Sequence, residues 1–158
     1  MHTEIRVQEA DFDLGAVTEA MRARQRDIGA IASFVGVVRE HTASVDAAAR
    51  GLYLEHYPGV TERSLQDIVD RAAERWPLLD VVVVHRVGWL APTEQIVLVV
   101  VGSAHRHAAF AACAYVMDYL KTDAVFWKKE RRADGSEAWI ESTAGDHHAA
   151  AEWHRPPG

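Results

Sequence analysis

Residues 79–102, LDVVVVHRVGWLAPTEQIVLVVVG, decide the fold because they contain two valine-rich strands separated by a turn. Continuous runs of valine are typical of strands that are buried on both faces. Between the runs, Gly88 and Pro92 in the segment GWLAPTE suit a turn that joins neighbouring strands. The stretch therefore predicts a strand pair at the centre of the molecule.

Two further strands are expected before this pair. Residues 28–39, IGAIASFVGVVR, carry no charge before Arg39, which is typical of a buried strand that ends in an arginine. Residues 52–57, LYLEHY, alternate between two faces, with Leu52, Leu54 and His56 on one of them. The polar, small-residue segment 41–50 between these strands shows no period, so we expect a mobile loop there.

The spacing of apolar residues and the capping residues predict two long helices. Thr61 is the expected N-cap of a helix with apolar residues at helical spacing, which Pro77 stops. Ser103 is the expected cap of a second helix over residues 104–120, which carries apolar residues on most of its surface. This second helix must be largely enclosed.

The C-terminal third is predicted to hold a hairpin. The segments AVFWKKE and EAWIE look like the two strands of a hairpin joined through RRADGS, where Asp134 and Gly135 supply the turn. Residues 142–158 form a tail that we expect to be helical up to Trp153. Strands mixed with two or three main helices indicate an α+β fold, and 158 residues make one folded unit the expectation for residues 1–158.

Composition excludes several classes of partner. The formal charge of −6 argues against recognition of nucleic acid or an anionic membrane through global charge. The apolar runs are too short to cross a bilayer. Cys113 is the single cysteine and cannot form an internal disulfide, so we expect a soluble protein of the reducing cytoplasm.

Ionisable residues concentrate between Lys121 and Arg132, where five basic and two acidic residues leave a charge of +3. This segment is a candidate anion site, and a solvated hairpin edge is the alternative. Lys121 closes an apolar helix, where partial burial would lower its pKa and make the amine a usable acid, base or nucleophile. Lys128 follows Phe126 and Trp127 and is expected beside apolar material as well.

A second basic group, SAHRH at residues 103–107, lies at the expected start of the enclosed helix. Free backbone N–H groups and the helix dipole favour a negative ligand there, so His105 and Arg106 indicate a phosphate site that Arg39 could complete. Exposed polar residues at an ordinary helix start explain the same pattern, and the periodicity does not separate the two interpretations.

The histidine spacing does not favour a metal site. His105 and His107 are two residues apart, which turns them to nearly opposite sides of a helix. His56 and His85 lie within strands, and we interpret them as hydrogen-bonded core or interface residues. Cys113, in an alanine-rich helix, is interpreted as a small apolar filler and not as a sulfur carrier. The residues alone thus predict an α+β domain with a cationic anion pocket.

Four segments, LEHYPGVTERSL, RWPLLDVVVVHRVGWL, SAHRHAAF and MDYLKTDAVFWKKE, closely resemble the large subunit of molybdopterin synthase, the MoaE family, in this order and spacing. The resemblance covers roughly residues 28 to 142. It implies an α/β hammerhead-type fold and a central homodimer. It also implies a small ubiquitin-like subunit docked on each outer end, giving a heterotetramer, whose C-terminal Gly-Gly thiocarboxylate enters the active site.

The resemblance also implies roles for individual residues. The catalytic residues would be Lys121 of MDYLKT and Lys128 of FWKKE. The residues implied in anion binding, in a pocket built across the dimer interface, are Arg39, His105 and Arg106. Further positions that would line the pocket or contact the inserted tail are Phe34, Met117 and Glu130.

The implied reaction converts cyclic pyranopterin monophosphate into molybdopterin by two sulfur transfers, with no metal or other cofactor for this step. A regulatory module that binds a ubiquitin-like tail and a metal-dependent hydrolase are the alternatives. The chain departs from the family pattern at Pro92-Thr93-Glu94, where relatives usually read Pro-Gly and an acid. A second departure is Ala124-Val125, where the family often has Ala-Pro.

Overall fold

The computed structural model describes residues 1–40, 49–132, 134–140 and 144–154. The elements, in chain order, are β1 (His2–Gln8), α1 (Leu14–Arg24), β2 (Ala30–Val37), β3 (Ala49–His56), α2 (Val60–Arg75), β4 (Asp80–Arg86), β5 (Gly88–Leu90), β6 (Gln95–Ser103), α3 (Arg106–Leu120), β7 (Phe126–Arg132), β8 (Glu137–Ile140) and α4 (Ala144–Glu152). The expected α+β class is confirmed. Most of the loop expected at 41–50 lies outside the described residues, and its last two residues begin β3.

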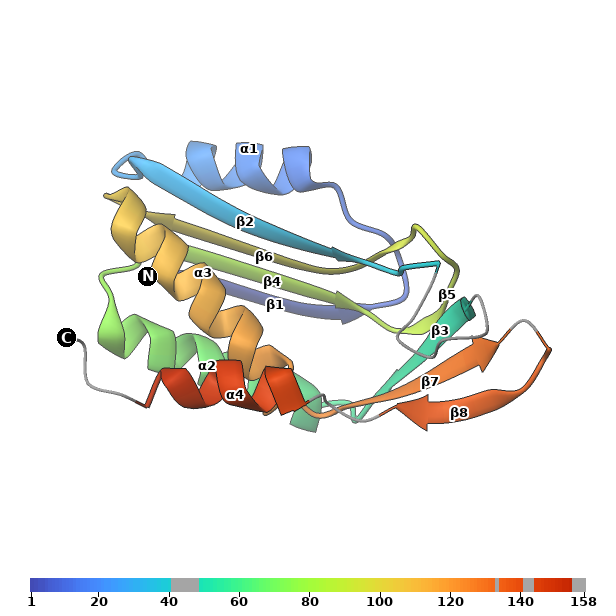
Figure 1. The fold of residues 1–158 in the computed structure, drawn as a ribbon. Helices are drawn as coiled ribbons and strands as arrows, with labels where there is room; N and C mark the ends of the chain where they lie inside the picture. Colours follow the sequence, from blue (N-terminus) through green and yellow to red (C-terminus); the bar gives the residue numbers. More distant parts are fainter. Residues whose placement is uncertain (41–48, 133, 141–143, 155–158) are drawn as a thin grey trace.

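The valine-rich strands β4 and β6 form the centre of a mixed sheet with the order β1-β4-β6-β2. β1 pairs with β4 in parallel, while β4 with β6 and β6 with β2 are antiparallel. Helix α1 covers one face of this sheet, and α2 and α3 lie on the opposite face (Figure 1). The predicted burial of both valine runs on both faces is confirmed.

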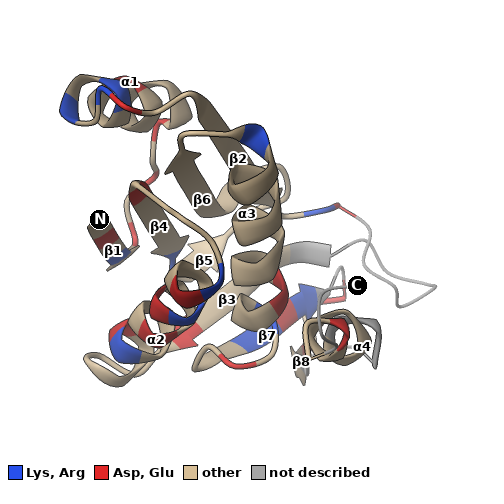
Figure 2. Ribbon diagram, turned by 90° about the vertical axis from the view of Figure 1, so that its left-hand side faces the viewer, with Lys and Arg blue, Asp and Glu red and all other residues tan. Residues whose placement is uncertain are grey.

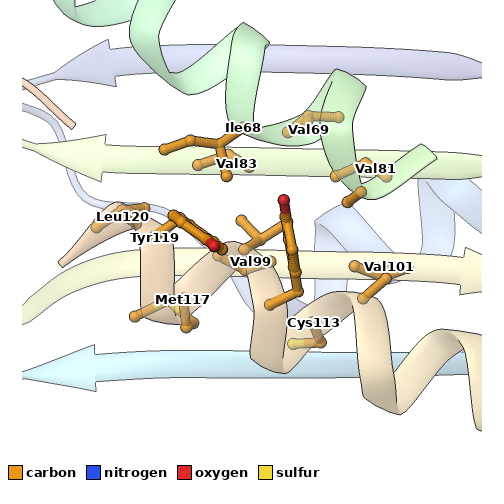
Figure 3. Packing of buried hydrophobic residues seen from close by; sticks show 14 of the residues in the cluster. Ile68, Val69, Val81, Val83, Val99, Val101, Cys113, Met117, Tyr119 and Leu120 are labelled. Atoms are coloured by element: carbon orange, nitrogen blue, oxygen red, sulfur yellow. The ribbon is translucent and has the colours of Figure 1, made fainter. Parts of the chain in front are cut away.

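The core divides into two layers because side chains alternate along β4 and β6. One layer packs under α2 and α3, and Figure 3 shows its strand residues facing both helices. The strand residues of this layer are Val81, Val83, Val99 and Val101. The other layer packs under α1 and contains Val82, Val84, Leu98 and Val100.

A second, antiparallel sheet with the order β5-β3-β7-β8 extends from one end of the first (Figure 1). The expected hairpin is confirmed as β7 and β8. The segment GWLAPTE, expected to be only a turn, also contains the short strand β5, which pairs with β3. A small apolar cluster joins the two sheets, and Leu52 and Leu54 face it as the alternation of β3 predicts. The buried members of this cluster are Val38, Leu54, Val87 and Leu90.

Both predicted helix caps are wrong. Helix α2 is preceded by Gly59 at φ 84°, whose N–H donates to the Glu62 carboxylate at 2.6 Å, and Thr61 lies inside the first turn. Ser103 ends β6, and its buried hydroxyl donates to the Pro77 carbonyl at 2.8 Å. His105 occupies the cap position of α3 instead. In both places a short polar side chain binds a distant part of the backbone, which local spacing does not reveal.

The two departures from the family pattern have visible local consequences. Thr93 takes a positive φ of 76°, a conformation that glycine adopts without steric cost, and its N–H donates to the Val38 carbonyl at 2.8 Å. Val125 keeps an N–H that a proline would lack, and it donates to the Ser64 hydroxyl at 3.3 Å. The register of β7 is thereby tied to α2.

The two chain ends pack against the rest of the fold. β1 and α1 were not predicted, because β1 is half-buried along its whole length and α1 buries only Met21. The C-terminal tail is helical as expected, and Trp153 donates from its indole to Asp118 of α3 at 2.6 Å. None of the described helices is both long enough and apolar enough to span a membrane.

The hydroxyl group of Thr61 holds the start of β7 in place, so we expect Thr61→Val to destabilise the protein. The buried hydroxyl donates to the Val125 carbonyl at 2.6 Å and accepts from the Tyr57 N–H at 2.9 Å. Removing it leaves two backbone groups without their partner, and we expect the free energy of unfolding to fall by about 2 to 3 kcal/mol in urea titrations.

Thr18→Val is the matched control. The Thr18 hydroxyl bonds only carbonyls of its own helix, at 3.0 Å from both Leu14 and Gly15, so a change of about 0.5 kcal/mol or less is expected. Equal losses in the two variants would show that the Thr61 contact has no special weight.

Candidate active site

A buried histidine lies where the two sheets meet. His85, near the end of β4, is 3% exposed, and its Nδ1 lies 2.8 Å from the Arg86 carbonyl oxygen. Its ring stacks on Phe126 of β7, with ring centres 3.9 Å apart and planes 22° from parallel. The prediction of a hydrogen-bonded core histidine is confirmed. The stack places the start of β7 directly against β4.

This histidine is held neutral. Burial, the largest cause, lowers the pKa of His85 from 6.5 to about 3, because the imidazolium would lose its hydration. The hydrogen bond to the Arg86 carbonyl acts in the opposite direction. The positive charges of Lys128, Lys121 and His56 lower the pKa of His85 further. Both lysines of the predicted site therefore act on the same buried ring.

Strand β7 sorts its charged residues onto two faces. Lys128 is half-buried and shares the inward face with Phe126, as the sequence predicts, and it pairs in register with Leu54. Glu130 follows on the same face and is 5% exposed. Lys129 points to the outer face, where its ammonium binds Glu137 at 2.8 Å. The cationic segment therefore has an inward face and an outward face, and the outward face fits the solvated edge that was the alternative interpretation, while the anion site on the inward face stays a prediction.

Lys121 forms the C-cap of α3, and its N–H donates to the Met117 carbonyl at 3.1 Å. Met117 itself is buried in the main core one turn earlier. The expected partial burial of Lys121 is wrong, since the side chain is exposed in the single chain. The amine therefore lies on the surface, where a group that arrives from outside would meet it.

Strand β2 brings two more predicted residues toward this end of the molecule. Gly29 at its start binds Ser103 just before α3, so β2 and α3 run in the same direction and finish at the same end (Figure 1). Arg39 is exposed and directly follows Val38, which packs in the cluster that joins the sheets. Phe34 is 40% exposed and lies on β2. Arg39 and Lys121 thus share one end of the fold.

His105 and Arg106 lie at the other end. Both are exposed at the start of α3, and Figure 2 shows this helix as mostly uncharged along its length. Arg106 and Lys121 are separated by the whole helix, which is about 22 Å at 1.5 Å per residue. One chain therefore does not bring the predicted phosphate residues to the lysines.

Among the described residues, the structure shows no site for cysteine chemistry or for metal binding. Cys113 is buried in the main core, and burial raises the pKa of its thiol to about 11, so it fits the predicted role of apolar filler. Within the described ranges, no three His, Cys, Asp or Glu side chains converge as metal ligands. His147 and His148 lie exposed on α4.

Sequence reasoning missed the central place of His85. The signal was available in part, since a histidine that interrupts a fully buried valine strand must have its polar atoms satisfied inside the protein. The partner ring, Phe126, lies 41 positions further along the chain by subtraction of the two residue numbers, and only the folded register brings it there. The spacing of residues along the sequence therefore does not indicate the contact between these two rings.

Together these features define a small α+β protein with two lysines, a buried carboxylate and a neutral imidazole at the junction of two sheets. The profile described as "MoaE protein" matches residues 7–123. The molybdopterin synthase catalytic subunit of Ralstonia nicotianae is 54% identical over 149 residues, which cover 94% of this chain and 83% of that protein. The one from Vibrio cholerae is 50% identical over 97% of this chain and 99% of that protein.

Solved structures agree. The MoaE protein of Burkholderia ambifaria superimposes with a TM-score of 0.82 at 49% identity, over 99% of this chain and 100% of that one. Molybdopterin synthase from Staphylococcus aureus gives a TM-score of 0.73 at 31% identity, over 87% of this chain and 95% of that one. The chain belongs to the MoaE family.

Because His85 is neutral when folded and protonates readily when unfolded, it should contribute to acid sensitivity. Between pH 6.5 and about 3 the unfolded chain binds the proton and the folded chain does not, so stability falls as the pH falls. From pH 7 to pH 4 this contribution is about 3 kcal/mol.

Urea unfolding of the wild type and His85→Gln at several pH values measures the contribution. The stability of the wild type should fall more steeply with acid than that of the variant. Parallel curves over this range would contradict a neutral, buried His85.

Proposed function

We propose that this protein is the catalytic subunit of a molybdopterin synthase. In this role it transfers sulfur from the thiocarboxylated C-terminus of a small ubiquitin-like subunit to cyclic pyranopterin monophosphate, forming the dithiolene of molybdopterin. The observation that carries the proposal is that the charges of Lys121 and Lys128 both lower the pKa of one buried ring, His85, at the junction of the two sheets in a chain of this family. The names of the relatives supply the reaction, and this geometry supplies the groups for it.

The two lysines suit different parts of the reaction. A thiocarboxylate and a phosphate are both anions, so cations must hold them close together. Lys121 is exposed at a helix end and is assigned to the thiocarboxylate and the acyl group of the incoming tail. Lys128 is half-buried beside Glu130 and is assigned to proton transfer and substrate orientation. Met117 and Phe34 are assigned to the lining of the path to these amines.

The phosphate residues require a second copy of the chain. Arg39 is at the lysine end of the fold, whereas His105 and Arg106 lie about 22 Å away along α3. A homodimer that places the start of one α3 beside the end of the other would complete the cationic site. The assembly then is a central dimer with one small subunit at each outer end, all of it in the cytoplasm, as the single cysteine suggests.

Replacing either lysine that is assigned a catalytic role should remove activity. Lys121→Ala and Lys128→Ala should each lower dithiolene formation about 100-fold or more with a thiocarboxylated small subunit and the pterin precursor, because each removes a proton-transfer or anion-binding group.

Lys129→Ala is the matched control, since Lys129 neighbours Lys128 but faces outward and binds Glu137. It should retain activity within about threefold. Near-normal product from Lys121→Ala would refute the assigned role, and equal loss in all three variants would point to a general effect of charge.

A composite site predicts complementation between two inactive variants. Lys121→Ala and Arg106→Ala chains, mixed and allowed to exchange subunits, form heterodimers in which one site has both wild-type residues. Random exchange should restore about a quarter of wild-type activity, measured as dithiolene product. No recovery, despite exchange shown by mass spectrometry of the intact dimers, would place both residues in a site within one chain.

A further inference from the structure

The outer face of the second sheet carries aromatic side chains from all four of its strands. Trp89 of β5, Trp127 of β7 and Trp139 of β8 are 46%, 44% and 56% exposed. Tyr53 of β3 packs against Trp89, with ring centres 5.0 Å apart. Tyr57, directly after β3, is also exposed. Single exposed aromatic residues are common, but a group of them on one face marks a binding surface.

Two of these tryptophans already hold a cation. The guanidinium carbon of Arg131 lies 4.1 Å from the ring centre of Trp89, and the ammonium of Lys129 lies 5.4 Å from that of Trp139. Both cations also bind the carboxylate of Glu137, at 3.1 Å and 2.8 Å. The face therefore repeats one arrangement, in which a cation lies between an indole ring and a carboxylate.

The third tryptophan has the ring and the carboxylate without the cation. Glu55 lies opposite Trp127 in the register of β3 and β7, so the two side chains share the outer face. Tyr57 packs against Trp127, with ring centres 5.8 Å apart. Among the residues that the structure describes, no cation lies over the Trp127 ring and none binds the Glu55 carboxylate. A cation from outside can complete this arrangement.

A hollow of about 380 Å³ opens beside Trp127. Its lining consists of Glu55, His56, Tyr57, Pro58, Trp127 and Trp139. An apolar ligand would remove water from the Glu55 carboxylate without replacing its hydrogen bonds, and an anion would be repelled by it and by the ring faces. The chemistry of the hollow therefore favours a cation.

A guanidinium group suits the hollow better than an ammonium group. It is flat, so it stacks on an indole ring while its N–H groups reach a carboxylate, and it is weakly hydrated. On this same face, the cation of Arg131 lies closer to its ring than the cation of Lys129. Beside the carboxylate, Pro58 and Trp139 offer apolar surface to the residues that flank an arginine in a polypeptide. Tyrosine, tryptophan and arginine also dominate the binding energy of protein interfaces.

We propose that the hollow beside Trp127 binds an arginine side chain of a partner protein, with the guanidinium stacked on the Trp127 ring and hydrogen-bonded to the Glu55 carboxylate. This inference goes beyond the proposed function and does not rest on it. Lys128 follows Trp127 but points to the opposite face of β7, so the hollow and the predicted catalytic lysine lie on two sides of one strand.

NMR titration of the full chain tests the proposal. The probe is the peptide acetyl-Ala-Arg-Ala-amide, and the indole N–H signals of the tryptophans are followed. The signals of Trp127 and Trp139 should shift with a Kd of about 1 mM or tighter, while those of Trp76 and Trp153 stay in place. The same peptide with citrulline, which has a similar shape and no charge, should bind about fivefold more weakly or worse.

Two substitutions separate the carboxylate from the ring. Glu55→Gln and Trp127→Leu should each weaken binding of the arginine peptide about threefold or more. The matched controls are Glu19→Gln, which removes an exposed carboxylate of α1, and Trp89→Leu, whose ring already holds Arg131. Both should leave the Kd unchanged within about 1.5-fold. Glu55→Gln keeps the shape of the side chain, so it decides the question even where Trp127→Leu does not fold.

Three results would overturn the proposal. Equal affinity for the arginine and citrulline peptides would show that charge plays no part. Ethylguanidinium bound as tightly as the arginine peptide would indicate a site for small cations instead of a polypeptide. Shifts of the Trp127 and Trp139 signals on raising the protein concentration without peptide would identify a second copy of the chain as the occupant.

Discussion

The antiparallel pairing of β4 with β6 is the constraint on which the rest of the fold depends. Both strands are buried along almost their whole length, so valines point into a core on either face. Each face must then be covered, by α1 on one side and by α2 and α3 on the other. Helix α3 covers the first sheet and crosses it obliquely, from the end where β2 begins toward the second sheet (Figure 1). Its length separates Arg106 from Lys121.

The site depends on how the second sheet is joined to this core. The contact is small, made of Val38, Leu54, Val87 and Leu90, with the His85–Phe126 stack beside it. Small apolar contacts alone permit some sliding of one layer on another, whereas a stacked ring with a fixed hydrogen bond permits little. The placement of Lys128 thus depends on the contact between His85 and Phe126, the one polar contact in an otherwise apolar junction. The residues that pack the two sheets together there also position the predicted site.

Much of the fold could be predicted from the sequence because its strong signals are local. Valine runs, the alternation of residues 52–57 and the Asp134-Gly135 turn each report structure within a few residues. The caps failed because the Thr61 and Ser103 hydroxyls bond to the Val125 and Pro77 carbonyls, which are remote in sequence. Within the site, the charge pattern indicated the two lysines, and the family resemblance added their catalytic roles. The exposure of Lys121 and the stack below Lys128 depend on where layers end and meet, which composition does not encode.

The electrostatics of the site follow from the same geometry. Clustered cations repel one another, and a neutral partner inside the cluster reduces the cost of placing an ammonium near apolar material. Protonation of His85 would add a positive charge near Lys121 and Lys128, and burial opposes this more strongly than the lysines do. With a pKa of about 3, the imidazole stays neutral near neutral pH.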